Sequence, residues 1–304
     1  MNKNQQQTFK DYLLEKDFSS STAKQHIHQA RFFEIWAADE NLPIESISYN
    51  DLLHYIQTRR TKVTQKTISL QMNSLRHFFD FLELPHNPTK QVNIKGIKRK
   101  KLYHILKPQE LEQLYQSFKI PEPTESTIHQ NWFRNQVLAA KRNRIMLGFM
   151  IWQGVTTTEL FKLVEKDVNL REGKVFIAGT RRSNERIIKL ESTQIMDLME
   201  YVQQVRQELL NVTKKESDQL FVSTGNGQRI NNAMNQFMKN LKTLNPNVDN
   251  AKQIRASVIT HWLKQHNLRQ VQYLAGHRYL SSTEAFLVND LDSLSVDIEK
   301  FHPF

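Results

Sequence analysis

Three basic side chains in the last third of the chain have the types and spacing of a site that holds a phosphate group. Lys252 and Arg255 lie three positions apart, so a helix would present both on one face. His277 follows them in the run Leu274–His277. A guanidinium gives phosphate a bidentate, charge-assisted contact that a neutral side chain cannot give. The alternatives are a surface Arg–Lys pair and a structural histidine.

The order of these motifs resembles the C-terminal signature of the tyrosine recombinases, the phage-integrase family. In that family a His-x-x-Arg helix is followed by Leu-Gly-His and then, nine residues after that histidine, by the tyrosine that attacks DNA. Here Lys252 takes the first histidine position, Arg255 the arginine position and His277 the second histidine position. Nine residues after His277 the chain has Phe286, which has no hydroxyl. The resemblance therefore implies a DNA transesterification site without its nucleophile.

Two further family positions depart from the pattern. The family's first arginine belongs to a turn of the form Gly-x-Arg-x-x-Glu-Leu, and the matching turn at 154–160 has Thr156 in its place. Losing one such donor costs on the order of 3–4 kcal/mol of transition-state stabilisation. The hairpin lysine that acts as the acid is replaced by Arg181, which is a poor proton donor. Glu159 of the same turn is interpreted as a helix-terminus carboxylate with no direct role.

Loss of the hydroxyl at Phe286 has two explanations, natural loss of activity or a deliberate Tyr-to-Phe change. Thr156 and Arg181 favour natural loss, because removing the nucleophile alone requires neither change. The first hypothesis is an inactive, sequence-specific DNA-binding protein from the recombination or integration system of a mobile element. The second is an active site-specific recombinase with an unusual or altered site. The third is a structural scaffold without DNA affinity.

Composition agrees with a polyanionic partner. The chain has 304 residues, with 42 Lys and Arg against 31 Asp and Glu, which gives a net charge of +11. This balance favours a polyanionic partner, which the resemblance implies is double-stranded DNA, although scattered surface lysines would produce the same sum. The absence of cysteine excludes disulfides, thiolate catalysis and Cys-ligated zinc. We expect no cofactor and no metal site, because the sequence shows no cluster of metal ligands.

The sequence also predicts a soluble, intracellular protein that does not enter a membrane. The polar N-terminus lacks the apolar core of a signal peptide. The longest apolar run, around Ile145 to Trp152, is much shorter than the ~20 residues that cross a bilayer.

The N-terminal part predicts four helices between about residues 5 and 86, the third starting at Asn50 or Asp51. This pattern resembles the core-binding domain of integrases. A dense basic run follows, which we expect to contact DNA through Lys95, Lys98, Arg99, Lys100 and Lys101. The resemblance implies that this linker crosses the DNA backbone; a nuclear-localisation signal or a solvated linker is the alternative. The expected boundaries are 1–88 for the helical domain, 89–105 for the linker and 106–304 for the catalytic-type domain.

The catalytic-type domain is expected to contain a long buried helix at about 136–153 and a small sheet with strands at 174–177 and 186–190. The turn between these strands carries Arg181 and Arg182, and we expect Arg182 to bind DNA. The C-terminal segment has an apolar stripe from Leu291 to Phe301. The resemblance implies that it docks on a second protomer, giving a dimer or tetramer on DNA; docking on its own domain is the alternative. The fold class is therefore mainly α with a small antiparallel β-sheet, in a two-domain, tyrosine-recombinase-like clamp.

Overall fold

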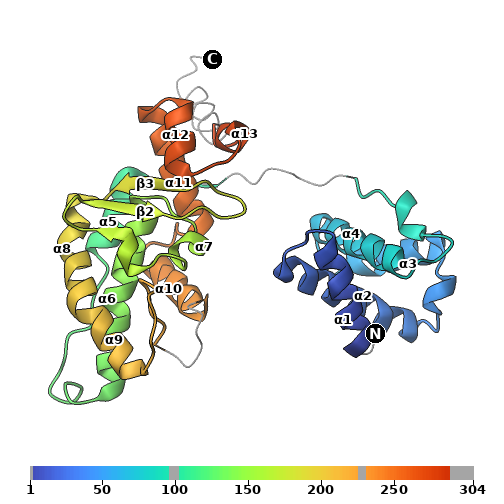
Figure 1. The fold of residues 1–304 in the computed structure, drawn as a ribbon, viewed down its shortest axis with the longest axis horizontal. Helices are drawn as coiled ribbons and strands as arrows, with labels where there is room; N and C mark the ends of the chain where they lie inside the picture. The colour runs from blue at the N-terminus through green and yellow to red at the C-terminus, as the bar shows by residue number, and fades with distance from the viewer. Residues whose placement is uncertain (1–2, 96–102, 225–230, 288–304) are drawn as a thin grey trace, which may run out of the picture. The chain divides into compact units, whose positions relative to one another are not determined.

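The computed structural model describes residues 3–95, 103–224 and 231–287. The chain forms two compact units, Met1–Lys101 and Leu102–Phe304, and each is described here by itself (Figure 1). Across the described ranges the protein is mostly helical with one small antiparallel sheet, so the predicted fold class is confirmed. None of the helices in these ranges is long and apolar enough to span a bilayer.

The first unit is a bundle of four α-helices within residues 3–81. These are α1 (Lys3–Glu15), α2 (Ser20–Asp39), α3 (Tyr49–Arg60) and α4 (Gln65–Phe81). Two short 3-10 helices, η1 (Ile44–Ser46) and η2 (Pro88–Gln91), lie after α2 and α4. In α2 the buried positions recur every three or four residues, so one face of the helix enters the core. The described part of this region has the four helices that the sequence predicts.

The third helix begins earlier than the sequence suggests. The Ser48 hydroxyl accepts the Asp51 amide at 3.3 Å, and the Asp51 carboxylate accepts the Ser48 amide at 2.8 Å. This capping box makes Asp51 the third residue of the helix and Ser48 its cap, so a start at Asn50 or Asp51 is wrong. After α4 the chain stays on the unit, where Val92 is 7% exposed and packs against the helical core.

The second unit is built around the long helix α6 (Asn131–Ile151), which packs against α5 (Pro108–Gln116), α8 (Ser192–Glu200), α9 (Arg206–Thr213) and α11 (Ala251–Gln265). The helix begins about five residues before the predicted start, because its first turn carries the exposed Trp132 and gives no clear apolar period. Its C-terminal third, from Ile145 to Ile151, is buried throughout. The remaining elements are the π-helical η4 (Tyr201–Val205), the 3-10 helix η3 (Glu165–Asp167), α7 (Thr157–Leu160), α10 (Asn231–Leu244), α12 (Leu268–Ala275) and α13 (Leu280–Glu284).

The sheet consists of β1 (Val168–Asn169), β2 (Lys174–Ile177) and β3 (Arg186–Lys189), paired in that order and antiparallel. The hairpin of β2 and β3 agrees with the prediction. Along β3 burial alternates, with Arg186 and Ile188 inward and Ile187 and Lys189 outward. The helix α12 contacts β3 directly, and Figure 1 shows the two next to one another. The alternation therefore places a cationic side chain on the buried face of the sheet, next to α12.

Candidate phosphate-binding site

The turn between α6 and α7 supplies the first wall of the site. Gly154 has φ +56°, and a Cβ there would stand 3.0 Å from the Trp262 ring of α11, so both conformation and space require glycine. Thr156 is the N-cap of α7: its amide donates to Glu159 Oε2 at 2.8 Å, and its hydroxyl donates to the same oxygen at 2.9 Å. Thr156 thus stabilises the turn and orients Glu159.

Glu159 is fully buried and pairs with Arg186 of β3. The Glu159 oxygens accept two hydrogen bonds from this guanidinium, at 2.7 Å from Nη1 and 3.2 Å from Nη2, and both side chains are 0% exposed. Burial acts to raise the pKa of Glu159, but the Arg186 hydrogen bonds and charge, together with the Thr156 amide, lower it to about 2. The carboxylate is therefore ionised at neutral pH. It is a helix-terminus carboxylate as expected, and it is also half of a buried ion pair.

Arg255 projects from α11 into the middle of the site. Its Nη1 donates to the Gly154 carbonyl, and its Nη2 donates to the Ala275 carbonyl at 2.6 Å. The same Nη2 lies 3.3 Å from Nε2 of His277, while Nη1 lies 3.9 Å from Glu159 Oε2. The side chain is 11% exposed, and burial, with the Arg186 charge, lowers its pKa to about 10. Arg255 remains a cation at neutral pH.

His277 is held as a neutral imidazole. Because a guanidinium can only donate, Nε2 must accept from Arg255, and the proton is assigned to Nδ1, which lies 2.9 Å from the Thr283 hydroxyl oxygen. Burial, followed by the charges of Arg255 and Arg186, lowers the pKa of His277 to about 4. The Phe286 ring stacks on the imidazole, with centroids 5.7 Å apart and an interplanar angle of 10°.

Gly276, directly before His277, contacts the β2–β3 hairpin. Gly276 has φ +66°, and a Cβ there would stand 2.9 Å from Arg186 Cζ and closer still to Nη1. Its carbonyl accepts the Asn184 amide at 2.8 Å, and Ser183 forms a β-bridge with His277. The α12–α13 turn and the β2–β3 hairpin are thus fixed to one another directly over the Arg186 guanidinium.

The structure brings together Arg255, His277, Phe286 and the Thr156 turn. Of the other predicted residues, Lys252 is exposed on the first turn of α11, and Arg181 and Arg182 are exposed on the hairpin turn. Lys95 is exposed at the end of the first described range, whereas Lys98, Arg99, Lys100 and Lys101 lie outside the described residues, as does the C-terminal stripe from Leu291 to Phe301. The roles of all these side chains stay predictions.

Sequence reasoning missed two side chains of the site. Arg186 belongs to a strand whose inward positions alternate with outward ones, so an arginine in register with Ile188 was a usable signal of a buried cation. Thr283 is 0% exposed and binds His277; its Ser-Ser-Thr run resembles the family's motif before the tyrosine position, but the sequence gives Thr283 no specific role.

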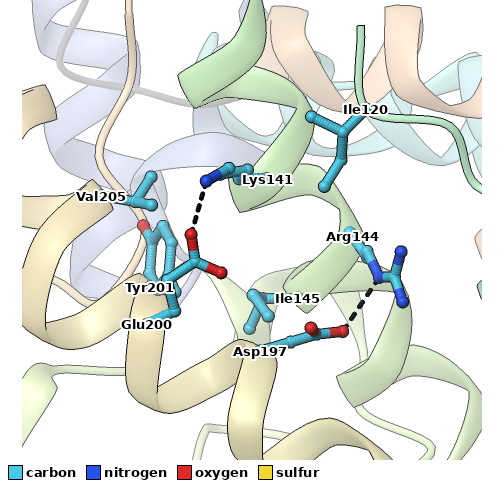
Figure 2. Close-up of a pocket in the computed structure, with 8 residues that line it drawn as sticks. All are labelled: Ile120, Lys141, Arg144, Ile145, Asp197, Glu200, Tyr201 and Val205. Carbon is cyan, nitrogen blue, oxygen red and sulfur yellow. Dashed lines mark hydrogen bonds and ion pairs between the residues drawn. The ribbon is translucent and has the colours of Figure 1, made fainter. Parts of the chain in front are cut away.

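A separate small pocket lies on the α6–α8 side of the unit and shares no residue with this cluster (Figure 2). Two ion pairs line it, Lys141 with Glu200 and Arg144 with Asp197, the second at 2.9 Å. Its volume of about 20 Å³ is close to that of one water, and its charged groups pair with each other. It has no features of a substrate site.

Comparisons with known proteins agree with the geometry. The phage integrase family matches residues 105–290, and the phage integrase N-terminal SAM-like domain matches residues 7–84. The chain is 25% identical to tyrosine recombinase XerC of Oceanobacillus iheyensis, covering 97% of this chain and 95% of that protein. It is 28% identical to XerC of Escherichia coli O127:H6, covering 82% and 78%.

Two solved structures share the fold. One is the XerH site-specific recombinase bound to difH substrate, with a TM-score of 0.65, 18% identity and coverage of 91% of this chain and 78% of that chain. The other is a lambda integrase dimer bound to a COC′ core site, with a TM-score of 0.61, 14% identity and coverage of 91% and 92%. With its catalytic-type and SAM-like units both matched by family models, the chain belongs to the phage integrase family, the tyrosine recombinases.

Proposed function

We propose that this chain binds double-stranded DNA within a site-specific recombination or integration system and does not cleave it from position 286. One observation carries the proposal: the ring of Phe286, at the sequence position of the family's tyrosine, stacks on His277. The ring is in place, but it has no oxygen that could attack a phosphodiester. A covalent phosphotyrosine at this position is therefore excluded.

Two other side chains support the loss of cleavage. Thr156, at the position of the first family arginine, has its hydroxyl and amide directed to Glu159 and brings no charge to the site. Arg181, at the position of the hairpin lysine, would bind a phosphate but would be a poor acid for the leaving 5′-oxygen. Three departures at three separate roles favour natural loss over a single engineered change.

A nicked suicide substrate tests the proposal. Cleavage next to the nick releases a short oligonucleotide and leaves any covalent protein–DNA adduct trapped, so the adduct is detectable on a denaturing gel. We expect no adduct from the chain with Phe286, together with a retarded band on a native gel. Any adduct formed by the unchanged protein overturns the inactive assignment.

The second candidate is an active recombinase whose nucleophile position was altered. It is favoured by the contact between Arg255 and His277, two family positions that this chain keeps together. On this view Phe286→Tyr alone restores strand cleavage. If cleavage requires Thr156→Arg as well, the loss of activity involved more than the nucleophile, and this second candidate fails.

The wider proposal has each unit contact the duplex, with residues 1–88 and 106–304 as the domains and 89–105 as the linker. Solved relatives with this fold are bound to DNA, one of them as a dimer, which supports a dimer or tetramer on DNA here. Origin in a mobile element fits the same proposal. A scaffold without DNA affinity is the outcome if no duplex is retained even at low salt, since phosphate-driven binding strengthens as salt falls.

A further inference from the structure

Glu159 lies between the guanidinium groups of Arg186 and Arg255 but forms hydrogen bonds only with that of Arg186. Its Oε1 accepts from Arg186 Nη1 at 2.7 Å. Its Oε2 accepts from Arg186 Nη2 at 3.2 Å and from the amide and hydroxyl of Thr156 at 2.8 and 2.9 Å. The nearest nitrogen of Arg255 stays 3.9 Å from Oε2, beyond hydrogen-bond distance.

This division of contacts determines the charge of the site. The two guanidinium groups, the one carboxylate and a neutral His277 sum to one positive charge. Because Glu159 is bidentate to Arg186, its negative charge mainly neutralises the arginine that is 0% exposed, and Arg255, which is 11% exposed, keeps its positive charge. One phosphodiester also carries one charge, of the opposite sign.

We propose that Arg186 is a positioning residue that holds Glu159 away from Arg255, so that the Arg255 charge stays available to a DNA backbone phosphate. The inference rests on the proposed function, since it needs Arg255 to face a phosphate. Without Arg186, the two oxygens of Glu159 lose their bidentate partner and lie within a small rotation of the Arg255 guanidinium. A direct Glu159–Arg255 pair then forms, and the site becomes neutral.

The packing around Arg186 agrees with a fixed, specific placement. The inward register of β3 and the missing Cβ of Gly276 leave the space in which this guanidinium meets Glu159 end-on, through Nη1 and Nη2. The hairpin and the α12–α13 turn close over it through the Asn184–Gly276 hydrogen bond. Arg186 therefore does not reach a substrate itself, and it acts through Glu159.

Three variants of the full-length protein test this inference by binding to one labelled duplex over the same series of salt concentrations, starting at low salt. Arg186→Met is expected to bind at least about tenfold more weakly and to lower the salt slope by about 0.9, the effect of losing one phosphate contact. Glu159→Gln is expected to bind as tightly as the unchanged protein or more tightly, because it removes the competing charge. The double variant is expected to return to within about threefold of the unchanged protein, since replacing a whole buried ion pair is often tolerated.

A purely structural role for Arg186 predicts a different pattern, in which Glu159→Gln weakens binding as Arg186→Met does, because each single variant leaves one buried charge of the pair unpaired. That pattern, or unchanged binding by Arg186→Met, overturns the inference. Thermal melts confirm that each variant is folded. If Arg186→Met does not fold, Glu159→Gln decides: binding as tight as that of the unchanged protein, or tighter, supports the inference, and a loss of about tenfold or more overturns it.

Arg255→Gln separates this inference from the proposed function. If the unchanged protein binds and Arg255→Gln binds about tenfold or more weakly, Arg255 holds a phosphate and the Arg186 variants decide the inference alone. If Arg255→Gln binds as well as the unchanged protein, the phosphate role of Arg255 is overturned, and the role of Arg186 with it.

Discussion

At the scale of single residues, two buried threonines differ in whether their hydroxyl group has a hydrogen-bond partner. Thr283 and Thr260 are both at most 2% exposed, but only the Thr283 hydroxyl has a partner among the described residues, the Nδ1 of His277. The Thr260 hydroxyl is buried and has no hydrogen-bond partner among the described residues. The two threonines therefore form a matched pair for measuring the worth of the His277 contact.

Thr283→Val keeps the side-chain shape and removes the acceptor of the His277 proton. We expect the free energy of unfolding to fall by about 1–3 kcal/mol, the cost of leaving a buried donor unsatisfied. Thr260→Val removes a hydroxyl that has no partner among the described residues and is expected to be neutral or stabilising. Urea denaturation of both variants measures the difference. Equal losses in the two variants would show that the Thr283–His277 hydrogen bond contributes nothing.

The protonation of His277 predicts a pH dependence of stability. Its pKa is about 4 in the folded protein against 6.5 when exposed, so between these values the unfolded chain binds the extra proton. Stability from this group is complete above pH 6.5 and is lost as the pH falls towards 4, with a limiting slope of about 1.4 kcal/mol per pH unit. The contribution of Glu159 to stability is lost at lower pH, as the pH falls from 4.5 towards the folded-state pKa of about 2.

Urea midpoints measured from about pH 7 to pH 4 check this slope, with His277→Gln as the control. The variant lacks the titrating imidazole, so its stability should decline less steeply than that of the unchanged protein between pH 6.5 and 4. Parallel curves in this window would place the lost protonation on other groups.

At the scale of elements, the junction of hairpin and turn over Arg186 depends on Gly276. Gly173 has a similar φ of +60°, but a Cβ there would first meet Ile195 at 3.8 Å, whereas at Gly276 it would collide with Arg186. Gly173→Ala should therefore cost only the left-handed backbone conformation, about 1–2 kcal/mol. Gly276→Ala adds the collision and should cost a further ~1–3 kcal/mol. Chemical denaturation compares them, and equal costs would contradict the close approach seen at Gly276.

The sequence predicts elements better than it predicts the contacts between them. Apolar periodicity is sufficient for the four N-terminal helices and for β2 and β3, because each pattern lies within one segment. The predicted start of α6 is wrong because its first turn is largely exposed and shows no apolar period. The predicted start of α3 is wrong because Asp51 is the third residue of the helix, where its carboxylate binds the amide of the cap residue Ser48. Helix ends depend on such side-chain contacts, which composition does not reveal.

For the site, motif spacing predicts the residues that come together and misses the one that organises them. Arg255, His277 and Phe286 are connected by short helices of fixed geometry, so their spacing carries the arrangement. Glu159 and Arg186 lie 27 positions apart on different elements. Their contact requires the register of β3 and the absent side chain of Gly276, and neither can be read from spacing alone.

At the scale of the whole molecule, the two units have separate hydrophobic cores. One core is built from residues between Phe9 and Val92, and the other from residues between Leu106 and Val258. We expect each unit to unfold cooperatively without the other. A fragment of residues 1–101 should lose its helical circular-dichroism signal in a single thermal unfolding transition, and calorimetry of the full chain should show the same transition. A fragment that stays unfolded would show that the first core needs the second unit.

The same division predicts how DNA binding depends on salt. The chain has a net charge of +11, and both units match domains of the phage integrase family. We therefore expect both units to bind phosphates of one duplex and to release the counterions of those phosphates. The slope of log affinity against log salt for the full chain should then approach the sum of the slopes for fragments 1–101 and 102–304. Because the second contact becomes intramolecular, affinity should exceed that of either fragment by about 10²-fold. Fluorescence anisotropy across a salt series measures both quantities, and a full chain that binds no more tightly than one fragment would mean that a single unit holds the DNA.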